Sequence, residues 1–417
     1  MPEPVHPAST TARNTTADAN DGLLPIAARQ PEHAERPFAR LDPHVVLTAL
    51  EDIGLPCDGH LQALNSFENR VFLVGLDNGE SRIAKFYRPG RWQREQLLEE
   101  HAFATELMMA EIPLAAPLPR QMLTASAEEL QDWRDVLEGV IIDAEDDEST
   151  PDCCNSAFCI QNSVKDTLYE SHGYFIAIYQ RQGGRVPEMD NIRHGPAMRQ
   201  RIGQFIARIH QVGARHAFSA RPAIEGQANC SQSIGIVLDS GWLPEDLRAG
   251  WESVARQCTD LIEQHLHPAG IDFSWIRLHG DCHLGNLLWT EAHGPHFVDL
   301  DDCLGGPAVQ DLWMIADAAG LQSGSADDAL PGTIPVAMQE LLDGYEQIRP
   351  FDRRELGLIE SLRTLRMIRH SAWLAARWND PAFPAAFPWF GTPQYWQGQI
   401  LHLRDQLDRL QQQPLPQ

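Results

Sequence analysis

The chain has 417 residues, of which 43% are hydrophobic and 22% charged, and its formal net charge is -25. This length allows two or three domains, or two lobes around a cleft. The negative charge argues against a general affinity for nucleic acid or for an anionic membrane, because both need basic patches, although a local basic pocket for phosphates remains compatible with it.

The N-terminal extension, residues 1 to about 38, is rich in Pro, Ala, Thr and Asn, and we expect it to be disordered. It lacks the basic start and apolar core of a signal peptide. No apolar run in the chain approaches the ~20 residues of a membrane-spanning helix. Because the eight cysteines are scattered, we predict reduced thiols and a cytoplasmic protein.

Residues 39–182 are predicted to form a β-rich first lobe with one long helix. "DPHVVLTALEDIGL" indicates a helix with Asp42 as N-cap and Pro43 at its first position. "RVFLVGLDNGESRIAKFYR" is typical of a β-hairpin around Asp77-Asn78-Gly79. "RWQREQLLEEHAFATELMMAE" has helical periodicity, and "YFIAIYQR" predicts a further strand.

A segment inside this lobe, about 120–172, fits neither pattern. It carries an acidic run, "DAEDDES", and a cysteine cluster, "CCNSAFC". We interpret it as a surface excursion or a small added element. The three cysteines lack a fourth ligand nearby, so we expect ordinary thiols rather than a metal site.

Residues 183–417 are predicted to form a mainly helical second lobe that contains the catalytic loop. Helical periodicity covers six stretches, about 196–213, 244–266, 307–319, 333–347, 353–378 and 393–411. The tryptophans near the C-terminus are expected to pack in the core of this lobe, at positions 373, 378, 389 and 396. The fold class is therefore α+β, with two lobes as in protein kinases.

The stretch "LHGDCHLGNLLW", residues 278–289, concentrates the groups that carry chemistry. A zinc site is disfavoured because Cys282 has no second cysteine in a C-x-x-C pair here. A Cys282 nucleophile with His283 as base is disfavoured because adjacent residues rarely point at each other. A kinase catalytic loop instead needs an Asp and an Asn five positions apart, with a His two positions before the Asp. His279, Asp281 and Asn286 have this spacing.

A second carboxylate follows at the expected place. "HFVDLDD" is a short β-run that ends in Asp299, 13 residues after Asn286, with Asp301 as a neighbouring alternative. The two motifs in this order are more specific than either alone. They predict a site where Asp281 orients the attacking hydroxyl, and Asn286 and Asp299 hold magnesium on the nucleotide phosphates.

The first lobe contains the lysine that such a site needs to bind the nucleotide phosphates. "RIAKFYR" places Lys85 in a strand between apolar neighbours, as the lysine that binds the α- and β-phosphates. The following helix supplies a glutamate partner. We prefer Glu100, which shares a face with Phe103 and Leu107, over its close rival Glu99.

A glycine-rich phosphate loop is missing. The chain has "LNSFENRVF" at that place, without a glycine between Gly59 and Gly75. Ser66, Asn65 and the backbone amides of this turn are the groups that would contact the phosphates. The loop also has His-Gly-Asp rather than His-Arg-Asp, and no A-P-E segment follows. Control by a phosphorylated activation loop is therefore not expected.

From about Leu41 to the C-terminus the chain resembles the bacterial stress response kinase A family, whose fold is similar to that of aminoglycoside and choline phosphotransferases. The resemblance rests on the motifs above and on "KFYRPGRW", "LLEEHAF", "FVDLDDCLGGPAVQDLWM" and "WNDPAFPAAFPWF". It implies a cytoplasmic serine/threonine protein kinase that uses ATP and Mg²⁺ in stress survival. By motif, Asp281 would be the proton acceptor, Asn286 and Asp299 the magnesium ligands, and Ser66 a residue of the ATP site.

The acceptor is the open question, because the catalytic residues alone do not distinguish a protein hydroxyl from a small molecule. The resemblance favours Ser or Thr residues of proteins, including the chain itself, and a monomeric enzyme. Residues remote from the ATP site, "EMDNI" and "DPAFPAAFPWF", are expected to shape the acceptor side of the cleft. The alternatives are a small-molecule phosphotransferase, acting on choline, homoserine or an aminoglycoside, and a scaffold that has lost catalysis.

Overall fold

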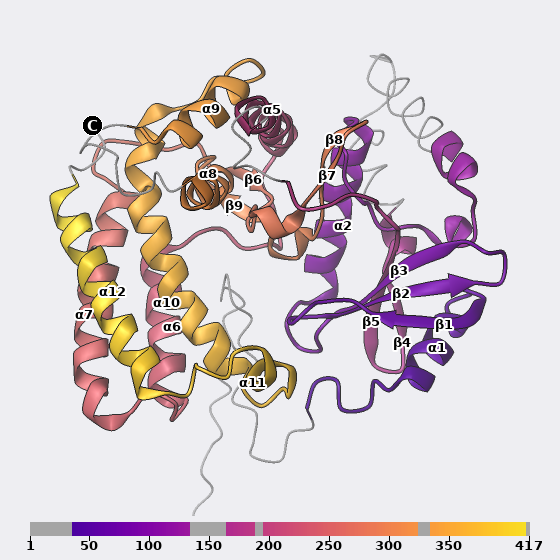
Figure 1. Ribbon diagram of the computed structural model, residues 1–417, viewed down its shortest axis with the longest axis horizontal. Helices are drawn as coiled ribbons and strands as arrows, with labels where there is room; N and C mark the ends of the chain where they lie inside the picture. The colour runs from indigo at the N-terminus through magenta and orange to yellow at the C-terminus, as the bar shows by residue number, and fades with distance from the viewer. Residues whose placement is uncertain (1–35, 134–163, 188–194, 324–333, 414–417) are drawn as a thin grey trace, which may run out of the picture.

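A β-sheet lobe and a helical lobe lie on either side of a cleft in the computed structural model (Figure 1). The structure describes residues 36–133, 164–187, 195–323 and 334–413. The N-terminal extension up to residue 35, the acidic run, the cysteine cluster and "EMDNI" lie outside the described residues. Within those described ranges, no helix is both long and apolar enough to span a membrane.

The N-lobe is built on one antiparallel sheet of order β1-β2-β3-β5-β4. Its strands are β1 (Cys57–Ala63), β2 (Arg70–Leu76), β3 (Ser81–Phe86), β4 (Tyr169–Ser171) and β5 (Tyr174–Gln180). The predicted hairpin is confirmed, because β2 and β3 pair around the Asp77-Asn78-Gly79 turn. Its register sets Val71 opposite Lys85, and β5 sets Ala177 on the other side of Lys85. The lysine is therefore in the middle of the sheet.

Two helices of this lobe lie where they were predicted. Helix α1 (Pro43–Asp52) begins where the Asp42 side chain accepts a hydrogen bond from the Val45 N–H at 2.9 Å. Helix α2 (Arg94–Met109) buries Leu97, Phe103 and Leu107. Glu100 is buried on the same helix and lies beside Lys85 of the sheet.

The segment 120–172 is not a separate excursion at its two ends. Leu123 and Leu130 are buried in the N-lobe core, and Tyr169 joins the same cluster from β4. The Tyr169 hydroxyl donates to the Leu118 backbone oxygen at 2.8 Å. A deletion of the whole segment would therefore remove part of the core of this lobe.

The C-lobe is mainly helical, as predicted. Its helices are α5 (Gly195–Gly213), α6 (Gly226–Asp239), α7 (Glu245–Leu266), α8 (Gln310–Ser323), α9 (Val336–Tyr345), α10 (Ile359–Arg377), α11 (Ala382–Ala386) and α12 (Pro393–Gln412). The sequence patterns missed α6, whose hydrophobic face is shared with polar residues, and they merged the 3₁₀ turn Arg353–Leu358 with α10. Helices α6, α7, α10 and α12 pack together on one side of the C-lobe (Figure 1).

Four short strands carry the loops that face the N-lobe. They form two antiparallel pairs, β6 (Ile276–Leu278) with β9 (Leu304–Gly306), and β7 (Leu287–Thr290) with β8 (Gly294–Phe297). The chain leaves β6 directly into residues 279–286, and it leaves β8 directly into residues 298–302. Both loops with the predicted chemistry thus start from paired strands.

Most of the C-terminal tryptophans pack as expected. Trp396 is fully buried and meets Trp251 edge-on at 5.9 Å between ring centroids. Core packing is wrong for Trp389, which is 42% exposed. It lies in the turn before α12, where one face of its ring packs on Tyr395 at 5.0 Å and the rest faces solvent.

Candidate active site

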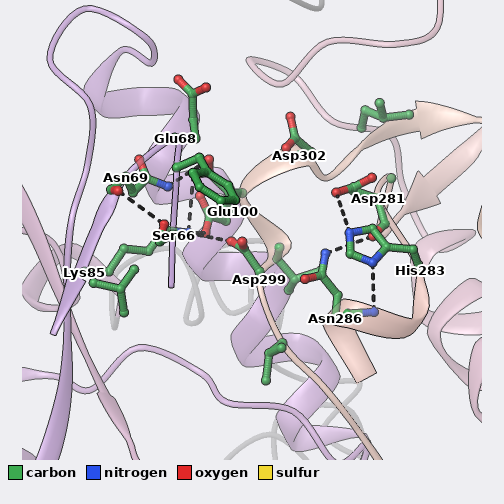
Figure 2. Close-up of a pocket in the computed structure, with 18 of the residues that line it drawn as sticks. Ser66, Glu68, Asn69, Lys85, Glu100, Asp281, His283, Asn286, Asp299 and Asp302 are labelled. Atoms are coloured by element: carbon green, nitrogen blue, oxygen red, sulfur yellow. Dashed lines mark hydrogen bonds and ion pairs between the residues drawn. The ribbon is translucent and has the colours of Figure 1, made fainter. Parts of the chain in front are cut away.

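A cavity of about 780 Å³ lies between the lobes. The N-lobe contributes the turn 64–69 between β1 and β2, and Lys85 of β3. The C-lobe contributes the loops around 280–286 and 298–302 and one face of α10. Every predicted site residue lines this cavity, and Figure 2 shows Lys85, Asp299, Asn286 and Asp281 facing it in sequence from one lobe to the other.

The loop after β6 is held by a carboxylate that sequence reasoning missed. Asp311, at the start of α8, is buried and accepts hydrogen bonds from the backbone N–H groups of His279 at 2.8 Å and Gly280 at 2.9 Å. The His279 ring bonds the Val298 carbonyl oxygen at 3.0 Å through Nε2. His279 therefore ties the loop that carries Asp281 to the loop that carries Asp299.

Gly280 explains the departure from His-Arg-Asp. Its φ is +86°, and a Cβ at this position would lie 2.1 Å from the Asp302 carbonyl oxygen. Both the positive φ and the close approach of another backbone require a residue without a side chain. An arginine in the middle of this motif does not fit the present arrangement of the two loops.

Asp281 lies half-buried at the end of this loop with two cationic or hydrogen-bonding neighbours. Arg366 of α10 donates from Nη1 to Oδ1 at 2.7 Å, and His283 Nε2 lies 3.4 Å from Oδ2. His283 Nδ1 accepts from the Gly285 N–H at 2.9 Å, so its proton belongs on Nε2, towards Asp281. Burial alone would raise the pKa of Asp281, but His283 and Arg366 together hold it well below its ordinary value. The carboxylate is therefore ionised at neutral pH.

Asn286 follows in a 3₁₀ turn, Leu284–Asn286, and is oriented by the same loop. Its side-chain NH₂ donates to the Asp281 backbone oxygen at 3.0 Å. The amide oxygen is the group that remains for a ligand in the cleft. In Figure 2 the amide lies between Asp281 and Asp299.

Asp299 and Asp301 differ in what surrounds them. Asp299 has a left-handed backbone (φ 62°, ψ 72°), a sparsely populated region for a non-glycine residue, and its side chain is 51% exposed. The Asp301 side chain is only 3% exposed and contacts Asn69, Lys85 and Arg91. Asp299 is thus the carboxylate with room for a further ligand, whereas Asp301 is already surrounded by N-lobe donors.

Lys85 reaches across the cleft from the N-lobe. Its Nζ lies 2.9 Å from Asp299 Oδ1, 3.4 Å from Asp301 Oδ1 and 3.8 Å from Glu100 Oε1. Burial opposes the charge of this lysine, but Asp299, Asp301 and Glu100 raise its pKa well above the ordinary value. The ammonium group is therefore charged despite being only 7% exposed.

The two candidate glutamates of α2 have different surroundings. Glu100 is buried beside Lys85, with Arg221 Nη1 3.9 Å from its other oxygen. Glu99 instead accepts backbone N–H bonds from residues 219–221, at 2.5, 2.8 and 2.6 Å. The structure brings Glu100, rather than Glu99, to the lysine. Burial raises the pKa of Glu100 above its ordinary value, against the opposing effect of Lys85 and Arg221.

The glycine-free turn between β1 and β2 carries Ser66. The Ser66 hydroxyl donates to the Asn69 carbonyl oxygen at 3.2 Å and thereby closes the turn. Asn69 Nδ2 donates to Asp301 Oδ2 at 3.1 Å, a contact between the lobes. The hydroxyl and the turn line the cavity, so this turn occupies the place of a phosphate-binding loop.

A divalent cation fits the oxygen donors that face the cleft. Hard cations such as Mg²⁺ take carboxylate and amide oxygens, and in phosphotransferases one or two protein ligands suffice because substrate phosphates supply others. Asp299 and Asn286 match that need. No cluster of three or more His, Cys, Asp or Glu suited to a metal occurs among the described residues. Burial raises the pKa of the Cys282 thiol well above its ordinary value, which does not favour a thiolate nucleophile.

Comparison with known proteins points to the same class of site as the geometry of this cleft. The model of the phosphotransferase enzyme family (APH) matches residues 60–153 and 163–351. Stress response kinase A of Escherichia coli K12 is 34% identical over 378 residues, 91% of this chain and 96% of the relative. The serine/threonine protein kinase RdoA of Salmonella typhimurium LT2 is 35% identical over 379 residues, with the same two shares covered.

Solved structures share the fold at low sequence identity. The amicoumacin kinase hAmiN has a TM-score of 0.58 at 17% identity, with 89% of this chain and 94% of that one covered. A microcompartment-associated aminopropanol kinase has a TM-score of 0.56 at 14% identity, with 88% and 98% covered. Fold and cleft together define a kinase-like phosphotransferase. The chain belongs to the phosphotransferase enzyme family and, within it, to the stress response kinase A family.

Proposed function

We propose that the protein is an ATP- and Mg²⁺-dependent serine/threonine protein kinase that transfers the γ-phosphate to protein hydroxyls, including its own, in the cytoplasm during stress. The observation that carries the proposal is the placement of Asp281, Asn286 and Asp299 opposite Lys85 across one cleft. Phosphoryl transfer is catalysed mainly by positioning and by electrostatic stabilisation, which is what this arrangement offers.

Each group receives a role from its surroundings. Asp281, which is ionised and lies in the loop after β6, would orient the attacking hydroxyl and accept its proton. Lys85, fixed by Glu100, would bind the α- and β-phosphates. Asn286 and Asp299 would hold Mg²⁺, which when bound neutralises charge on the phosphates and fixes them in line with the acceptor. Ser66 and the backbone of its turn would cover the phosphates.

The choice of a protein acceptor rests on the relatives. The Salmonella relative is named a serine/threonine protein kinase, and the match covers most of both chains. The alternative, a small-molecule phosphotransferase, is favoured by the fold neighbours, which are named kinases of amicoumacin and of aminopropanol. At 14–17% identity these neighbours speak for the fold alone, so we prefer the protein acceptor.

One experiment separates these acceptors. The full chain is incubated with γ-labelled ATP and Mg²⁺, alone, with a protein pool that includes myelin basic protein, or with choline, homoserine or an aminoglycoside. We expect label on Ser or Thr of the enzyme or of an added protein, located by mass spectrometry. Rapid ATP turnover that needs a small molecule and leaves no labelled protein residue would establish the alternative. ATP bound but never turned over under any condition would indicate a scaffold.

A further inference from the structure

The turn that carries Ser66 is bound to the C-lobe through the carboxylate of Glu68, which is largely buried. Glu68 accepts hydrogen bonds from Trp373 Nε1 at 2.6 Å and from Arg377 Nη2 at 3.0 Å, both on α10. Arg88, which follows β3, lies 3.0 Å from Oε1 of the same carboxylate through its Nε. A side chain of the nucleotide turn is thereby bound to the far end of a C-lobe helix.

A second carboxylate, which is buried and belongs to the C-lobe, binds arginines of the N-lobe. Asp380 of the C-lobe, just after α10, accepts two hydrogen bonds from Arg70 Nη2, at 2.7 and 2.8 Å. It also accepts one from Arg88 Nη2 at 2.8 Å. Arg70 begins β2, immediately after the turn, and Arg88 touches both carboxylates. The two ion pairs are therefore one network across the lobes.

An apolar contact reinforces the network. Phe67, next to Glu68, packs on Phe383 and Phe387 of the α11 region, with ring centroids 6.4 and 5.1 Å apart. Within "DPAFPAAFPWF", Phe383 and Phe387 thus contact the β1–β2 turn, and Asp380 contacts the start of β2. Phe387 also lines the cavity, and a role of this segment on the acceptor side stays a prediction.

Burial decides how much these contacts matter. The side chains of Glu68, Asp380 and Arg377 are 13%, 5% and 5% exposed. Burial opposes ionisation of Glu68, but Arg377, Arg91 and Arg88 hold its pKa far below the ordinary value. Loss of one partner from a buried ion pair costs more than loss of one from an exposed pair, and without Arg377 the Glu68 charge would depend on Arg88 and Arg91 alone. We therefore expect the network to contribute to the position of the turn, and not to be a set of weak surface contacts.

The absence of glycine from the turn explains why it needs contacts from the C-lobe. A glycine-rich loop approaches phosphates because its backbone is free to adopt conformations that other residues avoid. The turn 64–69 lacks glycine, so its amides and the Ser66 hydroxyl need to be set in place by outside contacts. Those contacts come from residues more than 300 positions away in the chain.

We propose that Glu68 with Arg377 and Trp373, Asp380 with Arg70 and Arg88, and Phe67 on α11 form an interlobe latch that positions the phosphate-binding turn for ATP. The latch rests on the proposed function in taking this cleft as the ATP site. Its three arginines and Asp380 are positioning residues, because they do not line the cavity and act through Ser66 and the turn. Phe67, Glu68 and Trp373 also lie in the cavity wall. The latch places the C-terminal part of the chain in control of nucleotide affinity.

The test uses the full-length protein with Arg377→Gln and Asp380→Asn, and Arg377→Lys as the conservative variant. We expect Mg·ATP affinity by calorimetry, and KM for ATP, to weaken by roughly tenfold, which corresponds to about 1.4 kcal/mol. Turnover at saturating ATP and KM for the acceptor should stay near wild type. Arg377→Lys should recover part of the affinity. The matched control is Glu252→Gln, which breaks the exposed Glu252–Arg256 pair of α7 and should change neither quantity.

The outcomes are distinguishable. A wild-type protein that does not bind Mg·ATP would overturn the proposed function and the latch together. Wild-type binding with unchanged affinity in both folded variants, or a loss confined to turnover, would overturn the latch alone. Circular dichroism and melting curves report whether the charge variants fold. If they do not, Arg70→Lys decides, because Arg70 does not line the cavity, is 22% exposed, and would keep its charge while losing the two-oxygen contact with Asp380: weaker ATP binding supports the latch, and unchanged binding overturns it.

Discussion

Arg366 and Asp281 form an ion pair on the C-lobe side of the cleft, with 2.7 Å between Nη1 and Oδ1. The arginine comes from α10, 85 residues after the aspartate. It keeps the carboxylate ionised without closing off the site, because the Arg366 side chain is 46% exposed and the aspartate 23%. The proposed base is thus tuned by a residue that belongs to none of the kinase motifs.

We expect Arg366→Gln to make the enzyme more sensitive to acid. Arg366 and His283 depress the pKa of Asp281, and a base works only when ionised, so activity is lost as pH falls through this pKa. Loss of the guanidinium raises this pKa towards its ordinary value, and the acidic limb of kcat/KM against pH should move upward. Activity at pH 8, where the carboxylate is ionised in either protein, should be retained.

Arg363→Gln is the matched control for this pH profile. Arg363 is on the same helix but pairs with Asp317, away from the cavity. Its removal should leave the acidic limb in place. An acidic limb that is the same in wild type and Arg366→Gln would show that another group sets the pH dependence.

Asp281→Asn should abolish phosphoryl transfer while Mg·ATP still binds. Asparagine keeps the shape of the side chain but cannot accept the proton of the hydroxyl, and loss of a general base costs on the order of 10²- to 10⁴-fold in rate. Autophosphorylation rates and calorimetry measure the two effects separately. Asp352→Asn, at an exposed carboxylate paired with Arg354, is the control. Turnover above a few per cent of wild type in Asp281→Asn, on the order of the weakest effect above, would remove Asp281 from the role of base.

Asp299→Ala should weaken Mg·ATP binding by at least about tenfold, or about 1.4 kcal/mol. This carboxylate has room for a ligand beside Lys85, and metal-free binding of ATP should change less. Asp301→Asn should act differently. Asp301 is buried among Asn69, Lys85 and Arg91, and breaking such a network costs roughly 3–5 kcal/mol of folding free energy. If Asp301→Asn folds normally and loses the Mg²⁺ dependence, the metal site belongs to Asp301.

Local patterns in the sequence were enough to predict the two-lobed fold and the residues that meet in the cavity. The Asp42 cap, the Asp77-Asn78-Gly79 turn and the amphipathic face of α2 each depend on residues a few positions apart. Such short-range signals are visible without knowing which distant residues become neighbours. The spacing of Asp281, Asn286 and Asp299 is likewise local, and the structure brings them to one cavity with Lys85.

The supporting contacts could not be predicted in this way. Asp311 bonds the loop 279–280 from about 30 residues away, and Glu68 meets Arg377 across 309 residues. No periodicity or motif links such positions, because only the packed fold makes them neighbours. The departures "HGD" and "NSFENR" were visible as departures. Their causes could not be predicted. The Asp302 carbonyl oxygen lies 2.1 Å from where a Cβ of residue 280 would be, and Arg377 of α10 holds the turn through Glu68.

Gly280→Ala tests the packing of the two loops. The new Cβ would lie 2.1 Å from the Asp302 carbonyl oxygen, and the residue would keep a φ of +86°. Backbone strain of this kind costs on the order of 1–3 kcal/mol, and overpacking adds typically 1–3 kcal/mol. The loop should shift, and both turnover and melting temperature should fall. Gly270→Ala separates the two causes, because Gly270 has a similar φ of +82° but open space around its Cβ position. We expect Gly270→Ala to lose only the strain component of stability and to keep full turnover. Equal effects of the two substitutions in urea unfolding and in phosphoryl transfer would show that the close approach of Asp302 to Gly280 does not hold the catalytic loop.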